Sequence, residues 1–119
     1  MAASTWTFNT IWTNNSTGAV TTPWIDARNC KNVLIQLCGN GGTWTGTMNV
    51  EVSVDGVHSS VATPLLGSAQ PTSVPTIGAM VLLGPTPYFR LNKLTNTALA
   101  LDAIAYGFGD SNQKQGTLI

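Results

Sequence analysis

Charged residues are scarce in this chain. Only 8% of its 119 residues are Asp, Glu, Lys or Arg, whereas about 25% is usual for a soluble domain. Five acids balance five bases, so the net charge is zero and the basic footprint of a nucleic-acid-binding protein is missing. A neutral surface repels other copies weakly, which favours association with a larger assembly.

Long apolar runs are also missing. No run approaches the roughly 18 residues that a membrane-spanning helix needs. The residues after Met1 also lack the basic segment and the following apolar stretch of a secretory signal. We therefore expect no membrane partner and no secretory signal, with synthesis in the cytoplasm.

The chain has two cysteines and one histidine, too few for an ordinary zinc site at this spacing. If Cys30 and Cys38 lie on one extended strand, their Cα atoms are about 26 Å apart, far beyond disulfide reach. A sharp bend at 29–32 would bring them together; otherwise they are buried free thiols. His58 follows a turn and is expected near solvent. We predict no metal and no cofactor.

A catalytic set is not evident among the five acids. Asp55 belongs to a turn and Glu51 to the polar face of a strand, so neither suggests a carboxylate pair. Asp102 lies in an apolar strand, where an unpaired buried carboxylate is costly. We expect it to be exposed at an edge or paired, with Arg90 and Lys93 as the candidate partners. These observations predict a protein that is not an enzyme.

What the chain does have is strict alternation from Thr45 to Val57. Gly46, Met48, Val50, Val52 and Val54 alternate with polar residues, which predicts a half-buried antiparallel strand. Asp55-Gly56 then predicts a type I′ hairpin turn, with 57–66 as the returning strand.

Further strands are expected along the chain, and no segment has a helical apolar stripe. Their ranges are 6–12, 19–22, 33–38, 80–83, 88–94 and 97–108, with a loop at 39–42 and a loop or extended edge at 67–78. We predict an all-β domain at 1–108, a single antiparallel β-sandwich of seven or eight strands, jelly-roll or Ig-like, without substantial helix. A polar tail follows at 109–119.

The tryptophans have two possible roles. They can be core or interface residues, or a platform on which sugars stack. Trp44 stands beside a glycine-rich loop and is expected to be the most exposed. As candidate interface residues we name Trp6, Trp12, Trp44, Leu118 and Ile119.

Residues 32–108 resemble small β-sandwich structural proteins of tailed bacteriophages. The similarity lies in a buried strand at 33–38, a V-x-x-S-x-D-G hairpin at 50–56, an aromatic-Arg strand at 88–91 and a final apolar strand. In this chain Ser59-Ser60 stands where such proteins often have an aromatic residue.

The resemblance implies a virion component without catalysis, most of all a capsid decoration (cement) protein. Such a protein binds the major capsid protein on the assembled head and bridges capsomers, often as a trimer, and residues 1–5 and 109–119 would be its arms. The alternative is a tail, baseplate or fibre module that binds host glycan.

Overall fold

The structure, a computed structural model, describes residues 6–14 and 20–109, with side chains at 20–95 and 100–109. Eight strands form one connected antiparallel sheet, and the described residues contain no helix. The all-β, antiparallel prediction is confirmed. The sheet curls into a half-barrel, so its strands are not divided into the two separate sheets of a sandwich.

The strands differ greatly in length. They are β1 (Trp6–Asn14), β2 (Val20–Thr21), β3 (Ile25–Asp26), β4 (Asn32–Ser53), β5 (Ser60–Val61), β6 (Ser73–Val74), β7 (Ala79–Leu83) and β8 (Tyr88–Phe108).

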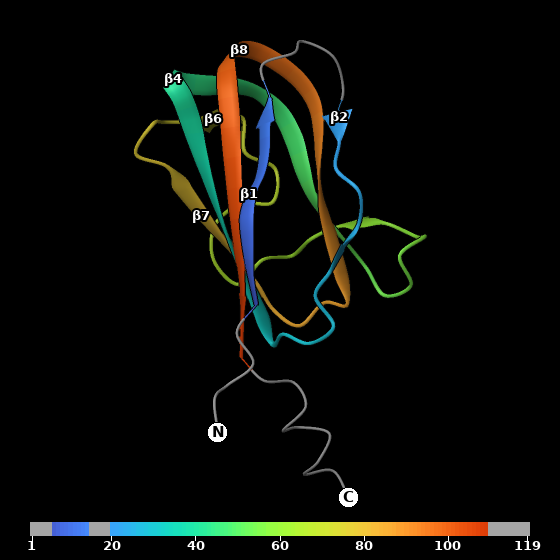
Figure 1. Cartoon of the computed structure of the whole chain (residues 1–119). Coiled ribbons are helices and arrows are strands. Elements are labelled where there is room, and N and C mark those ends of the chain that lie inside the picture. Colours follow the sequence, from blue (N-terminus) through green and yellow to red (C-terminus); the bar gives the residue numbers. More distant parts are fainter. Residues whose placement is uncertain (1–5, 15–19, 110–119) are drawn as a thin grey trace, which may run out of the picture.

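The two long strands, β4 and β8, form the frame of the sheet. They pair from Asn32↔Phe108 to Ser53↔Tyr88 and bend together, so the ribbon climbs one side of the molecule and descends the other (Figure 1). We call residues 32–40 of β4 with 100–108 of β8 the first half of this ribbon, and residues 48–53 with 88–93 the second half. In the first half β1 pairs with β8 and β7 with β4. In the second half β2 and β3 pair with β8, while β5 pairs with β4. Each long strand therefore belongs to both halves.

The bend contains one extra residue on β4. Between the pairs Asn40↔Ala100 and Met48↔Lys93 lie seven residues of β4 and six residues of β8. Since side chains alternate along a strand, one added residue exchanges the two faces of that strand. The core residues of β4 accordingly change from odd positions before the bend to even positions after it, whereas β8 keeps odd positions throughout.

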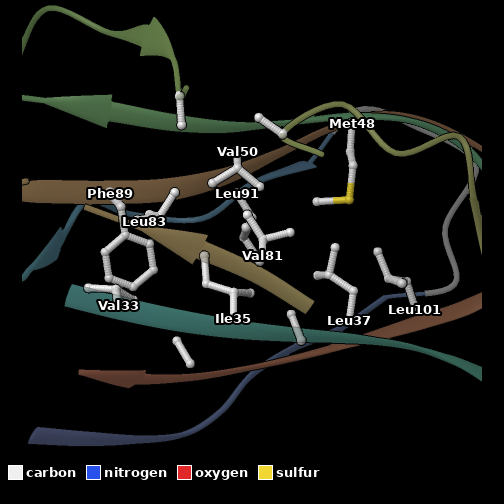
Figure 2. Close-up of a cluster of buried hydrophobic side chains, with 14 of the residues drawn as sticks. Val33, Ile35, Leu37, Met48, Val50, Val81, Leu83, Phe89, Leu91 and Leu101 are labelled. Carbon is white, nitrogen blue, oxygen red and sulfur yellow. The ribbon is translucent and has the colours of Figure 1, made fainter. Parts of the chain in front are cut away.

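The core lies between the two halves of the ribbon. Side chains from β4, β7 and β8 converge there, and Phe89 fits among Val33 and Leu83 at one end while Met48 closes the other (Figure 2). Because the two halves come from opposite ends of the same two strands, burying this cluster requires the bend.

Several predicted strands are confirmed, but two predicted breaks are wrong. Strands at 6–12, 19–22 and 80–83 correspond to β1, β2 and β7. The glycine-rich segment 39–42 is not a loop but part of β4, and the strands predicted at 88–94 and 97–108 are one strand, β8. Pairing with the other long strand keeps both segments extended. Most of the predicted tail, 110–119, lies outside the described residues.

The predicted two-residue turn is also wrong. The return to β4 begins only at Ser60, and β5 has two residues rather than the ten expected. Gly56 does have a positive φ of 76°, as its place in a turn requires. The connection is wider because the Asp55 side chain, rather than a cross-strand bond, satisfies the backbone N–H groups that follow it.

A glycine-to-alanine exchange at the bend tests this frame. A Cβ at Gly46 would collide with the carbonyl oxygen of Thr95 and stand 2.6 Å from Cζ2 of Trp44. We expect Gly46→Ala to lower the free energy of unfolding by about 1–3 kcal/mol, measured by urea denaturation. Gly84→Ala is the matched control, because its Cβ would meet nothing closer than Leu65 at 3.8 Å. Equal stability of the two variants would contradict this account of the bend.

Candidate functional site

The connection after β4 is organised by the carboxylate of Asp55. Oδ1 accepts hydrogen bonds from the backbone N–H of Val57 (2.8 Å) and His58 (2.9 Å) and from Oγ of Ser53 (2.9 Å). Oδ2 lies 2.6 Å from Nδ1 of His58. The His58 side-chain contact, followed by these other hydrogen bonds, holds the pKa of Asp55 far below its ordinary value.

This arrangement stabilises a turn rather than activating a nucleophile. A serine nucleophile needs an effective base on its hydroxyl, but the Ser53 hydroxyl donates to the Asp55 carboxylate, which its lowered pKa makes a weak base. His58 contacts that carboxylate and not Ser53. Ser53 is buried and its Oγ also accepts the N–H of Gly56. As predicted, Asp55 serves the turn and His58 lies at the surface.

Beside this turn lies an open, mainly apolar groove of about 350 Å³. Its walls come from the end of β4, the segment after β5 and the Gly84–Pro87 connection. Val54 is 82% exposed and Leu65 62% exposed; the other apolar lining residues are Val52, Ala62, Leu83, Pro85 and Pro87. The sequence analysis missed this groove. It assigned Val54 to the apolar face of a strand, whereas the strand ends one residue earlier.

The outward face of the second half carries a polar network around Glu51. Its carboxylate accepts hydrogen bonds from Nε of Arg90 (2.8 Å) and Nδ2 of Asn92 (3.0 Å). Burial by itself would raise the pKa of Glu51, but the hydrogen bonds from Asn92 and Arg90 outweigh it and hold the pKa below its ordinary value. Thr21 on β2 donates to Asn92 in turn, so the network ties β2, β8 and β4 together.

The two tryptophans whose side chains are described, Trp24 and Trp44, do not form an open aromatic platform. The guanidinium of Arg90 covers the ring of Trp24 at 4.2 Å from its centroid. The expectation for Trp44 is wrong: it is 0% exposed, because the bend turns it inward as the first core residue of the second half. Its Nε1–H has no hydrogen-bond partner among the described residues.

The remaining interface candidates are not tested by this structure. Trp6 and Trp12 lie on β1, where they pair in register with Gly107 and Ala103, but their side chains lie outside the described part. Leu118 and Ile119 lie wholly outside it.

Lys93 is a feature that the sequence analysis did not foresee. It was placed correctly on the same face as Phe89 and Leu91, but that face is the core and Lys93 is 0% exposed. Burial lowers the pKa of its ammonium group. The register Met48↔Lys93 at the bend explains its position; lysine is otherwise a residue of the surface.

Both cysteines are free thiols, as expected, but only Cys30 is buried. Burial raises the pKa of the Cys30 thiol, which keeps it protonated and inert. Cys38 is half-buried on the outward side of β4.

The partners expected for Asp102 need correction. Arg90 binds Glu51 instead. The two neighbouring strands that would have brought Asp102 to Arg90 or Lys93 are one strand, β8. Asn40 Nδ2 lies 3.3 Å from Oδ2 of Asp102 across the β4–β8 pair.

Among the residues that the structure describes, no three His, Cys, Asp or Glu side chains cluster in a way that could hold a metal ion. Within the same residues, no helix has the length and apolar character to cross a membrane. No protein-family model, curated protein or solved structure matches the chain.

The Glu51 network leads to a stability prediction. Glu51→Gln removes the charged acceptor from Arg90 in a nearly buried site, and we expect a loss of about 1–3 kcal/mol in the free energy of unfolding, measured by urea denaturation at neutral pH. Asp26→Asn is the control. It breaks the solvent-exposed pair of Asp26 with Arg28, which should change stability by less than about 1 kcal/mol. A Glu51 variant as stable as the control would show that the network contributes little.

The Asp55 turn leads to a prediction about acid. A carboxyl whose pKa is lower in the folded than in the unfolded chain stabilises the fold above the unfolded pKa of about 4, and this stability is lost as the pH falls further. The melting temperature of Asp55→Asn should therefore fall less steeply than that of the wild type below that pH.

The control for this measurement is His58→Ala. It removes the largest of the Asp55 interactions and leaves the backbone donors, so part of the acid dependence should remain. Parallel melting curves for wild type and Asp55→Asn would refute the role of this carboxylate.

Proposed function

We propose that this protein is a non-enzymatic structural component of a phage virion, a decoration protein that binds the major capsid protein on the outside of the assembled head. Its place would be the virion, and its partners the capsid protein and other copies of itself, with a trimer as the form that the resemblance implies. The resemblance described above is the starting point of this proposal.

The observation that carries it further is the groove beside the Asp55 turn. Large aliphatic side chains stand open to solvent around it, Val54 and Leu65 foremost, on a chain with almost no charge. Exposed apolar surface of this kind is typical of protein–protein contact. The carboxylate of Asp55 and the prolines of the 84–87 connection hold the walls in place, and a rigid site loses less entropy when a partner binds.

The sandwich architecture belongs to the same proposal. The two halves of the β4–β8 ribbon face one another across the core, as the sheets of a sandwich do. We propose that the curled sheet corresponds to the jelly-roll or Ig-like sandwich of such virion proteins and encloses the core in the same way.

The glycan-binding alternative receives no support from the described tryptophans. Trp24 is covered by Arg90 and Trp44 is buried, whereas sugar stacking needs an open aromatic face. The side chains of Trp6 and Trp12 lie outside the described residues.

The experiment that tests the proposal is to break purified virions into heads and tails and to locate the protein with an antibody. A decoration protein stays with the heads. Recovery with tails would support the alternative, and absence from both fractions would refute a virion role.

The groove is tested by binding to heads from which the protein has been stripped. The double variant Val54→Asp, Leu65→Asp places two carboxylates where an apolar partner would bury them, so we expect occupancy to fall at least about tenfold. Ile77→Asp is the control: Ile77 is 86% exposed and is not part of the groove lining. Equal occupancy for both variants would place the capsid contact elsewhere.

A further inference from the structure

The outward faces of the two halves of the sheet have opposite character. In the second half, the outward positions of β4 and β8 carry Asn49, Glu51 and Ser53 opposite Tyr88, Arg90 and Asn92. In the first half the same two strands carry mostly apolar residues outward. The same pair of strands therefore turns polar residues outward in one half and mostly apolar residues outward in the other.

We call the outward surface of the first half the outer face, formed by Leu34, Leu66, Met80, Leu82, Ile104 and Tyr106. Register pairs place these residues on one side of the sheet, because directly opposed residues of antiparallel strands share a face. One row runs Leu66↔Leu82↔Leu34↔Tyr106 and the next runs Met80↔Gln36↔Ile104. The opposite side of these strands is the core.

The outer face is open to solvent in the described structure. Ile104 and Tyr106 are each 39% exposed and Met80 is 50% exposed. Tyr106 stacks on Phe108 with ring centroids 5.9 Å apart, so the aromatic surface continues along β8 beyond the row of Tyr106. The first row crosses four neighbouring segments without a polar residue, and the second crosses three with Gln36 as its one polar residue. Apolar rows of this extent are unusual on the surface of a monomer.

We propose that the outer face packs against the outer face of a second copy of this chain. Charge is the first argument. Asp102 is the one charged residue among the described outward positions of this half, and it stands at the rim beside Asn40. A two-fold axis through the apolar rows places the apolar residues of one copy on those of the other without bringing two charged residues together. A net charge of zero also leaves little repulsion between copies.

Area is the second argument. The face spans four neighbouring chain segments and about six residues along the strands, so each copy offers on the order of 400 Å² of flat sheet. Two copies would bury roughly 800 Å², which is the size of a weak, reversible interface. Face-to-face packing of sheets is also a standard way to cover such rows.

This inference does not rest on the proposed function, because it concerns the purified protein alone. The test is sedimentation velocity from low to high micromolar concentration on the wild type and on Ile104→Lys. We expect the wild type to form a dimer rather than the trimer that the resemblance implies, because a two-fold contact closes with two copies; a trimer would overturn the inference. The lysine variant should raise the dissociation constant about a hundredfold or more, since each interface would bury two unpaired ammonium groups.

Two further variants make the result specific. Val54→Lys adds the same charge at a residue far more exposed than Ile104 and away from the outer face, and it should dimerise like the wild type. Met80→Gln changes a half-exposed residue of β7 without adding charge, which guards against misfolding of Ile104→Lys; it should weaken the dimer as well. Thermal melting checks that each variant is folded.

The inference is overturned if the wild type stays monomeric throughout the concentration range. It is overturned too if Ile104→Lys and Met80→Gln dimerise like the wild type, since the contact would then lie elsewhere, for instance on β1. Loss of the dimer in Val54→Lys to the same extent would also refute it, because charge alone would then be the cause.

Discussion

The pairing of β4 with β8 through a shared bend is the constraint on which the other contacts depend. Every other strand of the sheet hydrogen-bonds to one of these two, and the core is closed because their two halves face one another. The extra residue of β4 at the bend decides which of its side chains enter the core on each side. A different register would turn Val50 or Ile35 to the surface.

The bend also explains the least expected positions in the chain. Trp44 enters the core as the chain completes the bend, and the missing side chain of Gly46 leaves room for its ring. Lys93 lies opposite Met48, where the register shift ends. An indole N–H that has no hydrogen-bond partner among the described residues lowers stability. Both residues lie at the bend, whose register places them in the core.

The two outward faces show how one ribbon can carry two kinds of surface. Around Glu51 the polar groups hydrogen-bond to each other and join β2 to the long strands. These polar groups of the second half therefore find their partners within the same chain. Around Ile104 the apolar rows have no counterpart among the described residues of the chain itself. The groove beside Asp55 is a third surface, at the end of the second half. A protein built to assemble would use such separate surfaces for separate contacts.

Local sequence predicted what depends on neighbouring residues. Alternation identified the strand through Met48 and Val50, the face shared by Phe89 and Leu91, and the role of Asp55 in its turn. These features follow from side-chain period and hydrogen bonding within a few residues.

The same patterns failed where distant pairing decides the outcome. Glycines at 39–42 indicate a loop, and only the partner strand β8 keeps them extended. Asp102 and Arg90 looked like neighbours because a break was assumed between their strands.

The amino-acid sequence by itself therefore determined the all-β class, the scarcity of charge and the strands β1, β2 and β7, since these need no knowledge of distant contacts. Tertiary structure alone decided the merging of segments into two long strands, the inward turn of Trp44, the groove beside Asp55 and the exposure of the outer face. Each of these depends on the register between residues 35 to 76 positions apart, which a single residue at the bend can shift and which no local pattern records.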